Sequence, residues 1–258
     1  MNKDKLLNIE INGEKTQVPE GATVLDAAKK LGIFIPSLCY HEALSTYAAC
    51  RICIVEMHMK KNNRINSWIE AACVYPVEDG LSVKTNSPKV NKERKLVLEL
   101  LLSKSPDSHV LNELAVKYGA DKNRFTAKDM GESNCILCGL CVRVCNEMMK
   151  IDSIGTAYRG INKKVITPYR IANELCVGCT ACAYVCPTAA IRIKESKNNT
   201  TLENWDTTLE MKKCKLCNKP YAPAAHIERI KKMADIDDDI LDTCPHCRKL
   251  KLMNLLNI

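Results

Sequence analysis

Apolar and polar residues alternate along residues 5–11, which predicts a β-strand with one buried face. Asn12-Gly13 follows directly, and this dipeptide favours a tight hairpin because both residues tolerate positive φ. Residues 15–18 are therefore expected to return as a second strand. The same alternation predicts further strands at 53–59, 67–72 and 80–85, with a hairpin tip over 60–66.

A helix is predicted between these pairs of strands. Thr23 is expected to cap it, Lys30 to lie in its last turn, and Gly32 to end it. Hairpin, helix and then a cysteine-bearing loop is the order of elements in a β-grasp ferredoxin domain. We place such a domain at residues 1–86.

Two predicted helices follow in a stretch without cysteine. Ser87-Pro88 supplies a cap and a proline at the first helical position. The second helix is expected over 107–118, with Gly119 as its stop. Their apolar positions are Val90, Val97, Leu98 and Leu101 in the first helix, and Val110, Leu111, Leu114 and Ala115 in the second. We interpret residues 87–132 as a helical linker.

The rest of the chain divides into a repeat and a small final unit, which makes the predicted fold class α+β. Residues 133–195 contain two similar cysteine motifs with a hairpin insertion predicted over 151–169. Residues 196–208 are polar and are interpreted as a linker. The last unit, at 209–258, is predicted to be zinc-ribbon-like, with a helical stretch over 223–240 between its two cysteine pairs.

Cysteine adds the candidate chemistry. The chain has 16 cysteines, and they form four sets of four with none left over. The sets are Cys39, Cys50, Cys53 and Cys73; Cys135, Cys138, Cys141 and Cys145; Cys176, Cys179, Cys182 and Cys186; and Cys214, Cys217, Cys244 and Cys247. Sets of four thiolates at short spacings are typical of metal sites.

The second and third sets share the spacing C-x2-C-x2-C-x3-C, and Pro187 follows the last cysteine. This is the bacterial ferredoxin pattern, in which the fourth cysteine of each motif binds the other cluster. The rule predicts one 4Fe–4S cluster on Cys135, Cys138, Cys141 and Cys186, and a second on Cys176, Cys179, Cys182 and Cys145. Gly139 and Gly178 are expected to provide tight turns around the clusters.

The first set has the spacing C-x10-C-x2-C-x19-C, which predicts a 2Fe–2S cluster on Cys39, Cys50, Cys53 and Cys73. Its central C-x2-C and distant fourth ligand match the plant-type pattern, although the first loop is longer. His41 is interpreted as a neighbour of this cluster.

The fourth set has two separated C-x2-C pairs, which favour one tetrahedral zinc ion on Cys214, Cys217, Cys244 and Cys247. Mononuclear iron of the rubredoxin type uses similar pairs, and a third cubane is a further alternative. His246 lies inside the second pair and is expected to be exposed.

Charge and composition restrict the function classes. The formal net charge is +8, but four sites of four thiolates contribute roughly −8 when filled, so a basic nucleic-acid track is not expected. We expect no membrane span and no signal peptide, and place the chain in a reducing cytoplasm where cysteines bind metals rather than form disulfides. The sequence contains no glycine-rich phosphate loop, so a flavin or nicotinamide site is not expected.

Several motifs resemble the N-terminal part of the large iron–sulfur subunit of complex I. They are Leu38-Cys39-Tyr40-His41, the stretch Ala49 to Glu56, Ala72-Cys73, and the stretch Cys135 to Cys145. NAD(P)-linked hydrogenases and formate dehydrogenases carry similar modules in their diaphorase-type subunits. The resemblance extends over about residues 3–194, in the same module order.

That resemblance implies an extra cubane, bound by one histidine and three cysteines, which this chain is not expected to have. No cysteine occurs from residue 74 to residue 134, and His109 has no thiolate partners in the sequence nearby. His109 is therefore interpreted as a surface or capping residue.

The resemblance implies an electron-transfer subunit in a hetero-oligomer. A flavin-bearing partner would oxidise NAD(P)H, and this chain would relay single electrons to a further redox partner. Such complexes belong to a class that has electron-bifurcating members. It is not expected to be catalytic alone. The alternatives are an iron–sulfur subunit of succinate dehydrogenase or fumarate reductase, whose first loop is shorter, and a zinc-rich scaffold without redox function.

Overall fold

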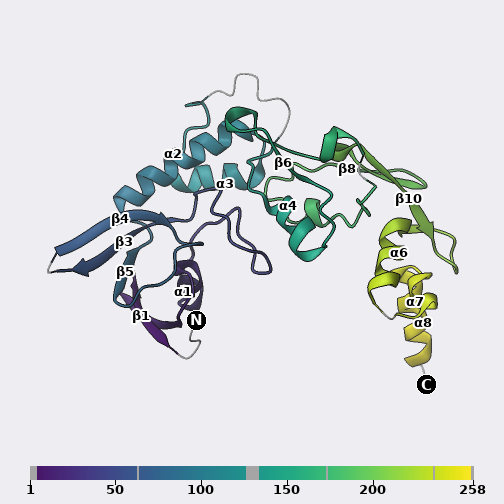
Figure 1. Ribbon diagram of the computed structural model, residues 1–258, viewed down its shortest axis with the longest axis horizontal. Coiled ribbons are helices and arrows are strands. Elements are labelled where there is room, and N and C mark those ends of the chain that lie inside the picture. Colours follow the sequence, from purple (N-terminus) through teal and green to yellow (C-terminus); the bar gives the residue numbers. More distant parts are fainter. Residues whose placement is uncertain (1–4, 63, 126–133, 173, 235, 257–258) are drawn as a thin grey trace. The chain divides into compact units, whose positions relative to one another are not determined.

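Figure 1 presents the computed structural model, which describes residues 5–62, 64–125, 134–172, 174–234 and 236–256. The chain forms two compact units, Met1–Leu140 with Pro187–Ala190, and Cys141–Cys186 with Ile191–Ile258. The domain boundary expected at 132/133 lies outside the described residues. Within the described ranges, no helix is both long and apolar enough to cross a membrane.

The first unit contains a five-stranded sheet in the order β2-β1-β5-β3-β4. Its strands are β1 (Leu6–Ile11), β2 (Glu14–Pro19), β3 (Ile54–Lys61), β4 (Arg64–Ala71) and β5 (Leu81–Lys84). Strands β1 and β5 pair in parallel, and all other neighbours are antiparallel. The predicted strands are confirmed, but the expected tip at 60–66 is too long, since Lys61 still pairs with Arg64.

Helix α1 (Val24–Lys30) contributes to the core of this sheet. Thr23 caps it, and the Asp26 side chain completes a capping box, as the sequence predicts for Thr23. The apolar side of α1 is buried with the inward residues of the strands. The core includes Ile9, Ile11, Val24, Ala27, Ala28, Val55, Met57 and Leu81. Cys53 and Cys73 belong to the same cluster, so the first cysteine set is built on the domain core.

Helices α2 (Pro88–Lys104) and α3 (His109–Tyr118) confirm the two helices of the predicted linker. Ser87 caps α2 with its side chain, and Gly119 ends α3 at a φ of 64°. The buried side of α2 differs from the prediction, because Val97 and Leu101 are only half-buried. Its buried positions are Val90, Arg94, Leu98, Glu99 and Leu102. Val90, Arg94, Leu98 and Leu102 are buried at every fourth position. The apolar pattern did not reveal this period, because one of its positions is a cation.

The second unit begins with short elements around the cysteine motifs. Helix α4 (Leu140–Arg143), whose first residue belongs to the other unit, continues into the π-turn η1 (Val144–Met148). Strands β6 (Gly155–Ala157) and β7 (Lys164–Ile166) form the predicted hairpin insertion. The 3-10 turns η2 (Gly160–Asn162) and η3 (Pro168–Arg170) and helix α5 (Ala181–Tyr184) complete this region.

A four-stranded antiparallel sheet in the order β11-β10-β9-β8 follows. Its strands are β8 (Ile193–Glu195), β9 (Asn199–Leu202), β10 (Thr207–Lys213) and β11 (Pro220–Pro223), with the 3-10 turn η4 (Glu203–Trp205) between β9 and β10. The prediction of a polar linker at 196–208 is therefore wrong. The hydroxyl groups of its threonines make the segment polar, yet threonine is β-branched and favours strands.

The chain ends in three helices, α6 (Ala224–Met233), α7 (Asp238–Leu241) and α8 (Pro245–Leu256). The first two account for the helical stretch expected at 223–240. Helix α8 was not predicted, and it places the second C-x2-C pair at the start of a helix. The zinc-ribbon expectation would instead have placed that pair on a hairpin.

Candidate metal centres

The first cysteine set lies in loops at one end of the β-grasp sheet. Cys39 and Cys50 belong to the long loop between α1 and β3, Cys53 directly precedes β3, and Cys73 follows β4. All four are at most 2% exposed. The tight course of the loop uses positive φ at Ala48 and Arg51. The structure thus brings together the four residues that the spacing assigns to one site.

Hydrogen bonds between thiols tie these four sulfurs into one group. The pKa of Cys39 is lowered to about 2, first by its contact with the Cys50 thiol and then by that with Cys73. The pKa of Cys53 is lowered chiefly by Cys73, while the same contacts raise the pKa values of Cys50 and Cys73. Four thiols gathered this closely can hold one cluster once their protons are displaced, because iron–sulfur clusters are bound by thiolates.

Arg94 of α2 is a residue of this site that the sequence analysis missed. It is fully buried, and it donates to the carbonyl oxygens of Ile52 at 3.1 Å, Ile54 at 2.7 Å and Thr85 at 3.2 Å. Burial lowers the pKa of its guanidinium, whereas Tyr118 and Cys53 act in the opposite direction. A buried cation therefore lies beside the Cys50–Cys53 turn. Its spacing of four from Val90 and Leu98 is the one sequence clue.

A cavity in the second unit brings Cys145 together with Cys176, Cys179 and Cys182. Cys145 comes from η1, and Cys182 from α5. Apart from the cysteines, the cavity wall is mainly apolar and includes Ile151, Ile154, Val177, Ala181, Leu202 and Trp205. The cysteine that joins the third set is thus the last one of the second set, which is the exchange that ferredoxin spacing predicts.

The chemistry of this cavity fits a cluster bound by thiolates. Burial raises the pKa of Cys145, whereas the backbone N–H groups of Ser153 and Ile154 oppose this by hydrogen bonding to its sulfur. Burial also raises the pKa of Cys179, and that of Cys182 to about 11. Thiols in such a pocket ionise on binding a metal, and N–H donors to sulfur are usual around iron–sulfur clusters.

The remaining ferredoxin cysteines divide between the two units. Cys135 and Cys138 belong to the first, and Cys141 and Cys186 to the second. Their common ligation stays a prediction from the spacing. Gly139 has a φ of +73°, as expected for a tight turn, and a Cβ there would lie 3.2 Å from the Tyr47 ring.

The fourth set forms a compact group of thiols. The sulfurs of Cys214, Cys217, Cys244 and Cys247 lie within 4.8 Å of one another, and those of Cys217 and Cys244 are 3.8 Å apart. Four bonds of 2.3 Å in a tetrahedron separate sulfurs by about 3.8 Å, so one zinc ion fits this group. The first pair lies at the β10–β11 turn, and the second at the start of α8.

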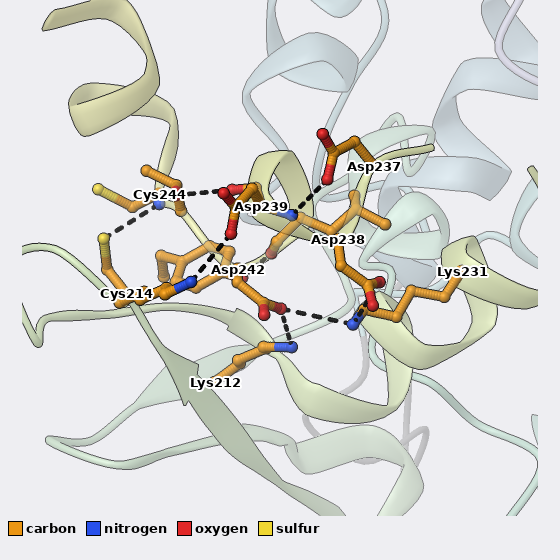
Figure 2. Close-up of polar contacts among 12 residues, drawn as sticks. Lys212, Cys214, Lys231, Asp237, Asp238, Asp239, Asp242 and Cys244 are labelled. Atoms are coloured by element: carbon orange, nitrogen blue, oxygen red, sulfur yellow. Dashed lines mark hydrogen bonds and ion pairs between the residues drawn. The ribbon is translucent and has the colours of Figure 1, made fainter. Parts of the chain in front are cut away.

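Figure 2 shows how ion pairs brace this group. The Asp242 carboxylate lies 2.6 Å from Lys212 of β10 and 3.5 Å from Lys231 of α6, which also contacts Asp238 at 2.7 Å. The Cys244 amide donates to Cys214 Sγ at 3.2 Å, and this bond is the main reason that the pKa of Cys214 is lowered to about 6. The strands, α6 and the cysteine pairs are thereby tied together.

The histidines near the cysteine motifs are exposed, as the sequence suggested for His246. His41 accepts a hydrogen bond from the Ala43 amide at 3.2 Å. His109 begins α3, and its Nδ1 lies 3.5 Å from Glu113 one turn later, with 89% of its side chain exposed. His109 is thus a surface residue at the start of α3.

Family models match the two kinds of cluster motif. Residues 4–88 match a 2Fe-2S iron-sulfur cluster binding domain, which contains the whole first set. Residues 169–192 match a 4Fe-4S binding domain, which contains the third set. The two matches agree with a 2Fe–2S domain at the first cysteine set and a 4Fe–4S motif at the third.

Curated relatives share these modules but are much longer. The chain is 35% identical over 215 residues to the NADP-reducing hydrogenase subunit HndD of Solidesulfovibrio fructosivorans, covering 72% of this chain and 36% of the relative. It is 34% identical over 184 residues to the NADH-ubiquinone oxidoreductase 75 kDa subunit of Reclinomonas americana, covering 63% and 26%. The chain thus spans about a third or less of these relatives.

A solved structure matches over a larger share of its own length. A chain of the NAD+-reducing [NiFe]-hydrogenase, crystallised in the H2-reduced state, superposes with a TM-score of 0.57 at 27% identity. The match covers 71% of this chain and 86% of the other.

The fold, the cysteine sites and these matches define an iron–sulfur cluster-binding protein with 2Fe–2S and 4Fe–4S modules. The chain is related to the iron–sulfur subunits of NAD(P)-linked hydrogenases and to the large iron–sulfur subunit of complex I. The sequence-based resemblance to these proteins is confirmed.

Proposed function

We propose that this chain is the electron-relay subunit of an oxidoreductase complex. It would carry single electrons between a flavin-bearing partner that oxidises NAD(P)H and a second redox partner such as a hydrogenase or formate dehydrogenase. The observation that carries the proposal is the exchange of Cys145 into the cavity of Cys176, Cys179 and Cys182. That exchange is the mark of a two-cluster ferredoxin, a module that serves electron transfer.

The ligands follow from the cysteine sets. Cys39, Cys50, Cys53 and Cys73 would hold a 2Fe–2S cluster, and Cys145, Cys176, Cys179 and Cys182 a 4Fe–4S cluster. Cys135, Cys138, Cys141 and Cys186 would hold the second 4Fe–4S cluster. The bound clusters would supply one-electron redox chemistry, while the chain excludes water and donates hydrogen bonds to sulfur.

Partners are inferred from the relatives. The names of HndD and of the structural neighbour state NADP reduction and NAD+ reduction for those proteins. The sequence of this chain has no glycine-rich phosphate loop, so we assign nucleotide and flavin to another subunit. The chain would then act as an electron-relay subunit in a hetero-oligomer of the cytoplasm.

For the fourth set we propose structural zinc. The compact sulfur group suits a single ion, and the four thiolates of a cubane, which each bind a different iron, lie further apart. Mononuclear iron is the alternative with the same ligands. Zinc has no redox chemistry, so this site would support the fold rather than the relay.

Metal analysis of anaerobically purified protein tests the assignment. We expect about ten irons and about one zinc per chain, from the three clusters and the C-terminal site. The reduced protein should give separate 2Fe–2S and 4Fe–4S signals in electron paramagnetic resonance. A colourless protein with about four zinc ions would instead support the scaffold alternative, and an iron content near six would remove one cubane.

An activity measurement tests the subunit role. The isolated chain should accept electrons from dithionite yet fail to oxidise NADH. Addition of a flavin-bearing diaphorase subunit should allow NADH to reduce its clusters. Oxidation of NADH by the flavin-free chain alone would contradict the role proposed here.

A further inference from the structure

Trp205 is a buried residue of the second unit that the cysteine motifs do not explain. It lies in the turn η4 between β9 and β10, and its side chain is 5% exposed. Its Nε1 atom is inaccessible to solvent and has no hydrogen-bond partner among the described residues. A buried N–H without an acceptor costs free energy comparable to a lost hydrogen bond, on the order of 1–3 kcal/mol. Such a group requires an explanation.

The cysteine sulfurs of a bound cluster are the acceptors that this cavity would offer to the indole N–H. Trp205 lines the cavity of the four cysteines, whose wall also contains the apolar Leu202, Ile151 and Ile154 and the hydroxyl residues Ser153 and Thr180. Cys182 lies in the wall of the same cavity, and the Trp205 side chain is within interaction range of its thiol. The indole N–H therefore favours negative charge on this sulfur.

The backbone fixes Trp205 in this position. Its carbonyl oxygen accepts from the Thr207 hydroxyl at 2.9 Å, and Asp206 adopts a φ of 48° to close the turn. The amide of Glu203 donates to the Arg192 carbonyl at 3.1 Å, which anchors the other side of the turn. The ring is thus held by the strands rather than by the cysteine loop.

A second contact places the same strands on the cysteine loop. Gly178 lies between Cys176 and Cys179, and a Cβ built on it would come within 2.5 Å of Leu209 Cδ1 in β10. Helix α6 adds a third contact, since Arg229 donates to the carbonyl oxygens of Met149 at 2.7 Å and Lys150 at 3.1 Å. The residues after 192 therefore form part of the cavity wall.

We propose that the indole N–H of Trp205 donates a hydrogen bond to the Cys182 sulfur of the bound 4Fe–4S cluster and raises the reduction potential of that cluster. The proposal rests on the proposed function, which assigns a cubane to this cavity. Reduction adds one electron and no proton, so the cluster gains one negative charge. A fixed N–H dipole stabilises that charge more in the reduced than in the oxidised state.

The inference changes the role of the C-terminal segment. Trp205 lies beyond residues 3–194, over which the motifs resemble the complex I and hydrogenase subunits. This segment would tune one cluster of the relay through a single donor. The cluster on Cys145, Cys176, Cys179 and Cys182 would then have a higher potential than it has without the donor.

Trp205→Phe tests the proposal, because phenylalanine keeps an aromatic ring in the wall and removes only the N–H. We expect iron content to stay at the wild-type value. The equilibrium constant for reducing this cluster should fall about tenfold, which corresponds to a potential lower by about 59 mV for one electron. The potential is measured by redox titration followed by electron paramagnetic resonance.

Trp68→Phe is the matched control. Trp68 is the other tryptophan of the chain, and it lies in β4 with its ring centroid 6.1 Å from that of Tyr75. This variant should leave the cubane potential unchanged. An equal potential in wild type and Trp205→Phe, with full iron content in both, would overturn the inference while leaving the relay function intact.

A measurement on protein that keeps Trp205 covers the case in which Trp205→Phe fails to load iron. The protein is Trp68→Phe, so that Trp205 is its one tryptophan, and it is labelled with indole-15N tryptophan. After exchange into D2O, pulsed electron paramagnetic resonance of the reduced cluster should detect a deuteron coupled through Cys182. A 15N coupling from the one remaining tryptophan would support the hydrogen bond. Its absence in protein with a normal cubane signal would overturn it. Wild-type protein without any cubane signal would instead contradict the proposed function.

Discussion

Arg94 donates a hydrogen bond from Nε to the carbonyl oxygen of Ile52, 3.1 Å away, in the middle of the Cys50–Cys53 turn. Its Nη2 reaches the carbonyl oxygen of Ile54 at 2.7 Å, one residue after Cys53. A single side chain from α2 thus fixes the backbone on both sides of a cysteine. The helix and the cluster site are thereby coupled, so the predicted linker is part of the first domain's structure.

Arg94→Met should therefore destabilise the first unit and its cluster site. The substitution removes the donors of three buried carbonyl oxygens, which we expect to cost about 3–5 kcal/mol in the free energy of unfolding. Denaturant unfolding followed by the visible absorbance of the 2Fe–2S cluster measures this loss. The matched control is Lys92→Met on the exposed side of α2, which should change stability by less than about 0.5 kcal/mol. Similar stabilities for both variants would contradict the role of Arg94.

The second prediction concerns the exchange of ligands between the cubane motifs. Cys145→Ser should convert or remove the cluster assigned to Cys176, Cys179 and Cys182, because Cys145 shares their cavity. The other cubane and the 2Fe–2S cluster should remain. Electron paramagnetic resonance of the reduced variant, with iron analysis, distinguishes the three clusters. If the lost signal is instead the one that Cys135→Ser removes, the assignment of Cys145 is wrong.

The spacing of cysteines predicted more of this site than the pattern of apolar residues did. Spacing alone placed Cys145 with the third set, since thiolate geometry around iron is strict and local in sequence. The wall that faces those cysteines could not be predicted, because Leu202 and Trp205 lie in a segment whose threonines and asparagines look like a linker. Arg94 was missed for a related reason. A cation enters a core only where tertiary contacts satisfy its donors, and those contacts come from loops distant in sequence.

The third prediction concerns the C-terminal metal. Cys217→Ser removes the exposed member of the compact sulfur group and should lower zinc content and the stability of this region. All iron signals should persist, since its ligands are separate from those of the clusters. Atomic analysis for zinc and iron on the same sample gives the answer, with Lys219→Ala, next to the β10–β11 turn, as a control. Loss of one iron per chain with no change in zinc would assign mononuclear iron to the site.

The last prediction separates backbone strain from close packing at the cysteine loop. Gly178 has a φ of +68°, and its missing Cβ makes room for Leu209 Cδ1 and for Pro223, whose Cγ would lie 3.0 Å away. Gly178→Ala should therefore lower the free energy of unfolding by about 1–2 kcal/mol from strain and a further 1–3 kcal/mol from overpacking. Gly160→Ala is the matched control, because Gly160 has a φ of +59° with nothing within 4 Å of the added Cβ.

The control should show the strain cost alone and keep its full set of clusters. Adding Leu209→Ala to Gly178→Ala opens the space that the new methyl group needs. The double variant should lose less stability than the sum of the two single variants, because the clash no longer exists, while the strain at residue 178 remains. Chemical unfolding, together with the retention of the cubane absorbance, measures both contributions. Additive effects of the two substitutions would contradict the contact between β10 and the loop of Cys176 and Cys179.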